Sequence, residues 1–251
     1  MKQVKILNIA INNLSQNELL RQLEKDGGVV FTPNVDHLMK MQKDQEFYEV
    51  YQKSNYRVCD GQILFWMLKL LGKPVKEKIS GSRFFPAFYQ HHKNKKNTKI
   101  FLLGAAPGVA ARAQKNINQK VGRNIVIDTY SPSFGFEKDD SECEYILDRI
   151  NNSGANVLVV GVGAPKQEKW IIKYKKFLTN INIFLAVGAS IDFEAGHKSL
   201  APKWISDAGL ETPYRLLSEP RRLWKRYLIE HPPFFYFVLQ EKLKLYRNPF
   251  G

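Results

Sequence analysis

Short apolar runs alternate with longer amphipathic stretches along most of the chain. The amphipathic stretches repeat apolar residues at helical spacing, and they predict helices at Ala105–Lys120, Asp139–Asn152 and Pro165–Phe177. Ser15 and Glu18 are spaced as a capping box, which predicts a further helix start. The apolar runs are rich in β-branched residues, and they predict strands at Val4–Ile11, Val29–Thr32, Arg57–Cys59, Ile100–Leu103, Ile125–Tyr130, Val157–Val160 and Ile183–Val187. This alternation is typical of an α/β fold with a mainly parallel sheet flanked by helices.

The pattern changes at Ala201, after which the chain is helix-like, basic and aromatic. We therefore expect an α/β core over residues 1–200 and a helical, basic C-terminal appendage over residues 201–251. A basic and aromatic helix suits an anionic membrane surface or a pyrophosphate. The same pattern is expected of a helix that packs on the core with its arginines extended to solvent. The run Phe234–Phe237 either extends a membrane-facing surface or is buried in a dimer interface. The basic residues of the basic and aromatic helix are Arg215, Arg221, Arg222, Lys225 and Arg226.

Composition narrows the class of protein. The 251 residues are 44% hydrophobic, which is normal for a globular core and excludes a disordered chain. The formal net charge of +14 favours a phosphate-bearing partner, whether nucleic acid, anionic lipid or a nucleotide-sugar diphosphate. Cys59 and Cys143 have neither metal-site nor disulfide spacing, which fits a reducing compartment. We read no signal peptide, and the late apolar run Phe234–Leu239 is far shorter than the roughly 20 residues that cross a bilayer.

Asp60 follows a predicted strand and directly precedes Gly61. Because ligands of open parallel sheets bind at the carboxyl ends of strands, its carboxylate is a candidate general base. An Asp-Gly pair before a helix is also common turn chemistry, so Asp60 can equally cap a helix that begins near Gln62. The spacing alone leaves both interpretations open and slightly favours the cap.

A second polar segment, TPNVDH, follows the predicted strand Val29–Thr32. Thr32 and Asn34 can bind sugar hydroxyls or phosphate oxygens at a helix N-terminus. Alternatively, Asn34 only caps the helix, with His37 on its exposed side.

Two glycine turns complete the set of candidates. Gly104 opens the turn in FLLGAAPGVAARA, where backbone N–H groups could cradle a diphosphate or simply form a tight strand-to-helix connection. In GVGAPKQEKW, the side chains after Pro165 offer a cation, an amide and a carboxylate at a strand end. The alternative is a solvated first turn whose carboxylate favours the helix dipole. These three side chains are Lys166, Gln167 and Glu168.

Eight blocks in order resemble the signature of the WecG/TagA/CpsF glycosyltransferases: TPNVDH, CDG, KISGSRFFPAF, FLLGAAPGVA, GVGAPKQEKWI, AVGASIDFEAG, LAPKW and YRLLSEPRRLWKRYL. The resemblance covers about residues 3 to 229. It implies a Rossmann-like core with an appendage that closes the site at the membrane. It also implies an inverting, metal-independent transfer from a UDP-sugar to a polyprenyl-diphosphate-linked sugar, in the synthesis of teichoic-acid linkages or other surface polysaccharides.

The resemblance also implies roles for individual residues. Asp60 stands at the position of the family's general base, and Thr32, Asn34 and Gln167 stand at polar positions that line the pocket. Two appendage arginines, Arg221 and Arg222, stand where the family's arginines approach the diphosphate. One departure concerns the block after Ile79, which usually reads Gly-x-Asp in the family but ends in Arg83 here. No sugar-binding role is therefore carried over to Arg83.

These residues define an expected mechanism. Asp60 takes the proton of the acceptor hydroxyl as it attacks the anomeric carbon. The chain has no Asp-x-Asp motif, so we expect no metal or other cofactor, and Arg215, Arg221, Arg222 and Lys166 to stabilise the leaving diphosphate.

The expected place is the cytoplasmic face of the inner membrane, with an anionic membrane surface as a partner, and a homo-oligomer is left open. A nucleic-acid-binding protein is a rival without a recognisable module, so no nucleic-acid partner is expected. An oxidoreductase lacks its dinucleotide fingerprint. A transferase with a soluble acceptor is disfavoured by the basic and aromatic tail.

Overall fold

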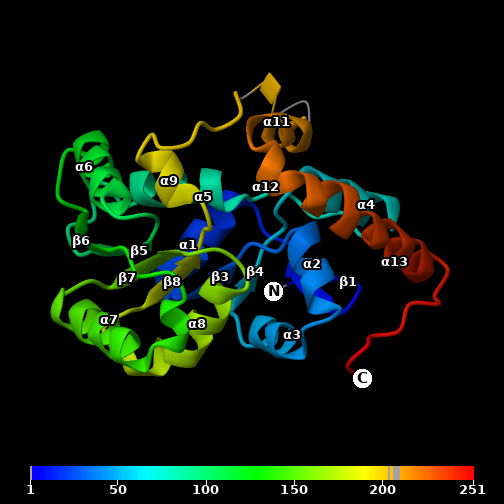
Figure 1. Cartoon of the computed structure of the whole chain (residues 1–251), viewed down its shortest axis with the longest axis horizontal. Coiled ribbons are helices and arrows are strands. Elements are labelled where there is room, and N and C mark those ends of the chain that lie inside the picture. Colours follow the sequence, from blue (N-terminus) through cyan, green and yellow to red (C-terminus); the bar gives the residue numbers. More distant parts are fainter. Residues whose placement is uncertain (1, 203, 206–209) are drawn as a thin grey trace.

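Within the described residues, a six-stranded parallel sheet forms the centre of the molecule (Figure 1). The computed structural model describes residues 2–202, 204–205 and 210–251, except for the side chains of Arg215 and Arg222. The strand order is β4-β3-β8-β7-β5-β6, and every neighbouring pair is parallel, which confirms the expected sheet. The strands are β3 (Gly28–Phe31), β4 (Tyr56–Arg57), β5 (Ile100–Gly104), β6 (Val126–Tyr130), β7 (Val157–Gly161) and β8 (Ile183–Ala186).

The N-terminal segment is a hairpin rather than one strand. We predicted a single strand over Val4–Ile11, but the chain folds into β1 (Gln3–Ile6) and β2 (Ile9–Asn12), which pair antiparallel. Leu7 adopts a φ of 50°, which reverses the chain. The buried side chain of Asn8 then donates to the carbonyl of Met41 in the core. The polar residue that interrupts the apolar run therefore marks the turn.

Helices follow the strands as predicted, with shifted starts. The Ser15 capping box is present in both directions, which confirms that helix start. The helix predicted from Ala105 begins only at Val109, because Ala105 (φ 60°) and Gly108 (φ 78°) form a left-handed turn. The helices are α1 (Gln16–Asp26), α2 (Val35–Met41), α3 (Gln45–Gln52), α4 (Gln62–Leu70), α5 (Gly81–His91), α6 (Val109–Val121), α7 (Asp140–Asn152), α8 (Lys166–Tyr174) and α9 (Ser190–Glu194). Single 3-10 turns lie at η1 (Phe136–Lys138) and η2 (Lys175–Phe177).

Two hydrophobic cores lie on opposite faces of the sheet. Successive strand residues point to opposite faces, so Phe101 and Leu103 belong to one core while Ile100 and Leu102 belong to the other. Helices α2, α3, α7 and α8 cover the first face, and α1, α5, α6 and α9 cover the second. Because both faces are covered, the strands read as nearly continuous apolar runs.

The C-terminal appendage consists of α11 (Glu211–Ser218), α12 (Pro220–Lys225), the π-helical η3 (Arg226–Glu230) and α13 (Pro232–Lys242). Helix α13 packs against α2, and the Glu241 carboxylate accepts a hydrogen bond from the backbone of Leu7 at 2.7 Å. A helical appendage is thus confirmed, whereas its predicted boundary at residue 200 stays a prediction. In the described part of the chain, no helix combines the length and apolar character that a membrane span requires.

Candidate functional site

A pocket lies where the carboxyl ends of β3 and β4 meet the appendage. Its walls come from the turn after β3, the turn and helix after β4, the start of α11, and the segment where η3 leads into α13. Polar residues from these segments are Asn34, Asp60, Gln62, Glu211, Thr212, Arg226, Tyr227 and His231. The pocket therefore joins segments that are far apart in the sequence.

Asp60 is half-buried in the wall of this pocket. Its backbone N–H donates to the carbonyl of Pro33 at 2.9 Å, which holds the end of β4 against the end of β3. The N-cap of α4 is Gly61, with a φ of 86° and no side-chain cap, so the interpretation of Asp60 as the cap is wrong. Its assignment as general base stays a prediction.

The side-chain oxygen of Asn34 makes two contacts, one that caps α2 and one that links α2 to the appendage. This Oδ1 atom accepts the backbone N–H of His37 at 3.2 Å, so the predicted helix cap is confirmed. The same oxygen lies 3.4 Å from Nη2 of Arg226, which donates to it. His37 was expected on the exposed side of the helix, but it is buried, with Nδ1 2.6 Å from the hydroxyl of Tyr51. Burial lowers the pKa of His37 to about 3, so the ring is neutral at pH 7.

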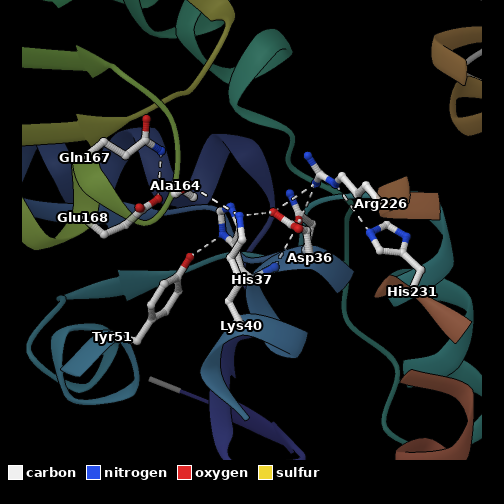
Figure 2. A network of polar contacts seen from close by, with 10 residues as sticks. Asp36, His37, Lys40, Tyr51, Ala164, Gln167, Glu168, Arg226 and His231 are labelled. Carbon is white, nitrogen blue, oxygen red and sulfur yellow. Dashed lines mark hydrogen bonds and ion pairs between the residues drawn. The ribbon is translucent and has the colours of Figure 1, made fainter. Parts of the chain in front are cut away.

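An ion-pair network centred on buried Asp36 holds Arg226 at the pocket (Figure 2). Asp36 lies between two cations, 2.9 Å from Nζ of Lys40 and 3.5 Å from Nη2 of Arg226. Burial would raise the pKa of Asp36, but the charges of Arg226 and Lys40 hold it below its ordinary value. Asp36 is therefore an anion that fixes Arg226. The sequence placed Arg226 in the basic cluster but not among the diphosphate-binding candidates, and only the Asp36–Lys40 spacing hinted at this network.

His231 completes the appendage side of the pocket. Its Nε2 lies 3.5 Å from Nε of Arg226, and burial together with the charge of Arg226 lowers its pKa to about 4. The ring is therefore neutral at pH 7, and the positive charge of this wall is carried by Arg226.

A second cleft of about 520 Å³ lies at the carboxyl ends of β5, β7 and β8. Glycine turns form much of its wall, including Gly161, Gly163 and Gly188. Gly104 has a φ of 130°, and a Cβ there would lie 2.6 Å from the carbonyl of Gly161. This approach confirms a tight strand connection and keeps the turns close together. Turns of this kind present backbone N–H groups to anions.

Lys166 lines this second cleft from the start of α8. Its Nζ lies 3.1 Å from Glu137 and 4.5 Å from the ring centroid of Phe134. The ring of Phe134 is fully exposed. A cation and an aromatic face are thus available at the edge of the cleft.

Gln167 ties two of the glycine turns together. Its Oε1 accepts from the N–H of Gly163 at 3.3 Å and of Gly188 at 3.2 Å, while its Nε2 donates to Glu168 Oε1 at 2.8 Å. Glu168 is fully buried, so the predicted solvated first turn is wrong. Burial raises the pKa of Glu168 to about 7, against the hydrogen bond from Gln167. Both side chains therefore support the cleft from the interior.

The remaining candidates lie apart from these contacts. Thr32 is buried at the end of β3, and Arg221 is exposed on α12. Arg83 is exposed in the first turn of α5. The side chains of Arg215 and Arg222 lie outside the described residues. The structure therefore places Asp60 and Asn34 in one pocket with Arg226, and it places Lys166 and Gln167 at the second cleft.

In a parallel α/β sheet, ligands bind at the carboxyl ends of the strands, and here a carboxylate, a guanidinium and glycine turns lie at that edge, as is typical of an α/β enzyme. The chain belongs to the glycosyl transferase WecG/TagA/CpsF family, whose model matches residues 4–248. This confirms the resemblance seen in the sequence.

Two relatives carry the same name, N-acetylglucosaminyldiphosphoundecaprenol N-acetyl-beta-D-mannosaminyltransferase. The protein of Bacillus subtilis (strain 168) is 29% identical over 96% of this chain and 93% of its own length. The protein of Bacillus spizizenii (strain ATCC 23059 / NRRL B-14472 / W23) is 28% identical over 82% of this chain and 76% of its own.

Proposed function

We propose that this glycosyltransferase moves a sugar of the N-acetylmannosamine type, or a related hexose or uronic acid, from a UDP-sugar to a polyprenyl-diphosphate-linked sugar. The product would enter the synthesis of teichoic acid or another cell-surface polysaccharide. The observation that carries the proposal is the pocket in which Asp60 lies with Asn34 and Arg226 at the carboxyl ends of β3 and β4. The names of the two relatives support the lipid-linked acceptor.

In the proposed mechanism, Asp60 is the general base. Its carboxylate takes the proton from the acceptor hydroxyl, whose oxygen forms a bond to the anomeric carbon. The bond from that carbon to the diphosphate breaks, and its electron pair leaves with UDP. Attack from the face opposite UDP inverts the configuration.

The leaving diphosphate needs positive charge or hydrogen-bond donors in this scheme. Lys166 at the edge of the second cleft supplies positive charge. The glycine turns have no side chains to keep a diphosphate away from the backbone, although the N–H groups of Gly163 and Gly188 donate to Gln167. Both features support this cleft as the site of the nucleotide. Arg226, held by Asp36, is a further cation, and it lines the first pocket together with Asp60. The proposed reaction uses these side chains in place of a metal or other cofactor.

We place the reaction at the cytoplasmic face of the membrane, where a lipid-linked acceptor would present its sugar. The appendage supports this, because it combines buried and exposed apolar residues: Leu223, Phe234 and Val238 are buried in the core, whereas Trp224, Leu228 and Phe235 are exposed. The buried residues agree with packing of the tail on the core, and the exposed ones support the proposed contact with a membrane. A homo-oligomer stays untested.

The test is transfer from a panel of UDP-sugars to a polyprenyl-diphosphate-linked N-acetylglucosamine, followed by UDP release and lipid product together. Asp60→Asn keeps the size of the side chain and removes the base, so we expect a loss of about 10²- to 10⁴-fold. Asp148→Asn, at an exposed position on α7, is the matched control and keeps full activity. Full activity of folded Asp60→Asn would refute the base. Absence of both UDP binding and transfer would refute the donor.

A further inference from the structure

Helix α4 is an apolar helix of the core with an apolar outer face. Its sequence is QILFWMLKL, yet only Leu64 and Leu68 are buried. Trp66 is 47% exposed and Leu70 is 54% exposed. At helical spacing, Trp66 and Leu70 lie on the side opposite Leu64 and Leu68. An amphipathic helix of a soluble core would carry polar residues there.

Helix α4 runs beside the end of the appendage. Its first residues line the Asp60 pocket together with η3. Just beyond its other end, Nζ of Lys73 lies 2.5 Å from the carboxylate of Glu241 on α13. Leu64 and Leu68 share one core with Phe234 and Val238 of α13. Figure 1 shows α4 and α13 at the same end of the molecule.

The outer face of the appendage is apolar in the same way. Single exposed apolar residues are ordinary on any protein surface, whereas a gathering of them marks an interaction site. Most of the large exposed apolar side chains of the described chain lie on α4 or after residue 203. On η3 and α13 they are Leu228, Ile229, Phe235, Tyr236 and Leu239.

Positive charges border these apolar residues. Nζ of Lys69 lies 4.7 Å from the ring centroid of Phe65 on α4. Exposed Lys225 adjoins exposed Trp224 on α12. A second copy of a chain with a net charge of +14 would be repelled, whereas an anionic lipid surface is complementary in charge. Apolar side chains flanked by lysine are also the composition of elements that lie in a bilayer interface.

We propose that α4, η3 and α13 form one membrane-docking surface, with Trp66 and Leu70 in the interfacial layer of an anionic bilayer. The choice of a lipid as the partner rests on the proposed function, since the acceptor is lipid-linked. Because Gln62 and Ile63 at the start of α4 line the Asp60 pocket, docking through α4 places the pocket mouth at the lipid surface. The core, and not only the appendage, then holds the enzyme at its acceptor.

Vesicle flotation tests the surface. The probes are phosphatidylcholine vesicles with and without phosphatidylglycerol. We expect the wild type to float with the anionic vesicles and Trp66→Ser/Leu70→Ser to partition roughly 10- to 100-fold more weakly, since two large apolar side chains are lost. The control is Phe177→Ser, which also removes an exposed ring with a lysine over it. Phe177 follows α8 and precedes β8, so it lies at the opposite edge of the sheet from Asp60.

A second measurement, fluorescence quenching, reports directly whether Trp66 lies in the lipid. Brominated lipids should quench part of the wild-type tryptophan fluorescence, and this part should fall in Trp66→Ser. The proposal is overturned if the wild type does not bind anionic vesicles, if quenching is unchanged in Trp66→Ser, or if the control loses binding as strongly as the double variant. A second copy is the occupant instead if the double variant dissociates an oligomer in sedimentation while flotation is unchanged.

The two proposals fail separately. Transfer to a short-chain, water-soluble acceptor should be equal in the wild type and in Trp66→Ser/Leu70→Ser, while transfer on vesicles should fall with flotation. If no UDP-sugar is used but flotation depends on α4, the proposed donor is wrong and the docking surface stands. If transfer on vesicles is unaffected by the double variant, the docking surface is wrong and the reaction stands.

Discussion

Replacing Glu168 by Gln should remove the part of the pH dependence of the free energy of unfolding that comes from this buried carboxyl group. Glu168 is fully buried, and its side chain accepts a hydrogen bond from the amide of Gln167. Burial raises its pKa to about 7 from an ordinary value of 4.5. Between these two values the folded protein keeps a proton that the unfolded chain releases, so stability falls as the pH rises and levels off above the folded pKa. A glutamine keeps the acceptor oxygen and resembles the protonated carboxyl group.

The size of the effect follows from the shift. A rise from 4.5 to about 7 corresponds to roughly 3 kcal/mol, at about 1.4 kcal/mol for each pH unit. Part of this change lies below pH 5, so we expect the free energy of unfolding of Glu168→Gln, relative to the wild type, to rise by roughly 2–3 kcal/mol between pH 5 and pH 8. Buried His37 and His231 titrate in both proteins, so their contributions cancel in this difference.

Urea unfolding at pH 5, 6, 7 and 8 measures this difference. Glu144→Gln, at an exposed position on α7, is the matched control and should follow the wild type at every pH. If the free energies of unfolding of Glu168→Gln and of the wild type change with pH in parallel, a protonated, buried Glu168 is refuted, even where the variant is less stable throughout.

Two further predictions concern the frame of the site. Gly104→Ala should lower the free energy of unfolding by roughly 2–4 kcal/mol, because its Cβ would lie 2.6 Å from backbone atoms, whereas Gly122→Ala, with a positive φ but open space, should lower it by about 1 kcal/mol. Equal losses in urea unfolding would contradict the close approach. Asp36→Asn and Arg226→Gln should be coupled by about 1–3 kcal/mol in a double-mutant cycle, because Asp36 is buried and Arg226 is only partly exposed; additive effects would refute the link between α2 and η3.

Local chemistry made much of the fold predictable. The strands were found from their apolar runs, because a strand covered on both faces has few polar residues. The Ser15 capping box and the Asn34 cap were found from their spacing, since a cap depends on residues three positions apart. The hairpin of β1 and β2 was missed because its two strands join in one apolar run, and the single Asn8 was read as an interruption rather than a turn.

The candidate site was predictable only in part. Asp60 and Asn34 were found because both follow predicted strands, and the carboxyl ends of parallel strands meet at one edge. Arg226 was not singled out, because the contact with Asp36 joins residues that the sequence does not relate. Glu168 was predicted as a binding residue, with a solvated first turn as the alternative, because a first-turn glutamate is usually exposed. Only the packing of α8 on the sheet buries it completely.

The sequence by itself determined the local elements, their apolar faces and the family, since these depend on neighbours a few residues apart and on the order of motifs along the chain. The tertiary structure decided the strand order, the capture of Arg226 by Asp36 and the burial of Glu168. It also decided that the apolar outer face of α4 lies beside α13. Such contacts depend on which apolar faces pack together, and many pairings satisfy the same local pattern until the whole chain is folded.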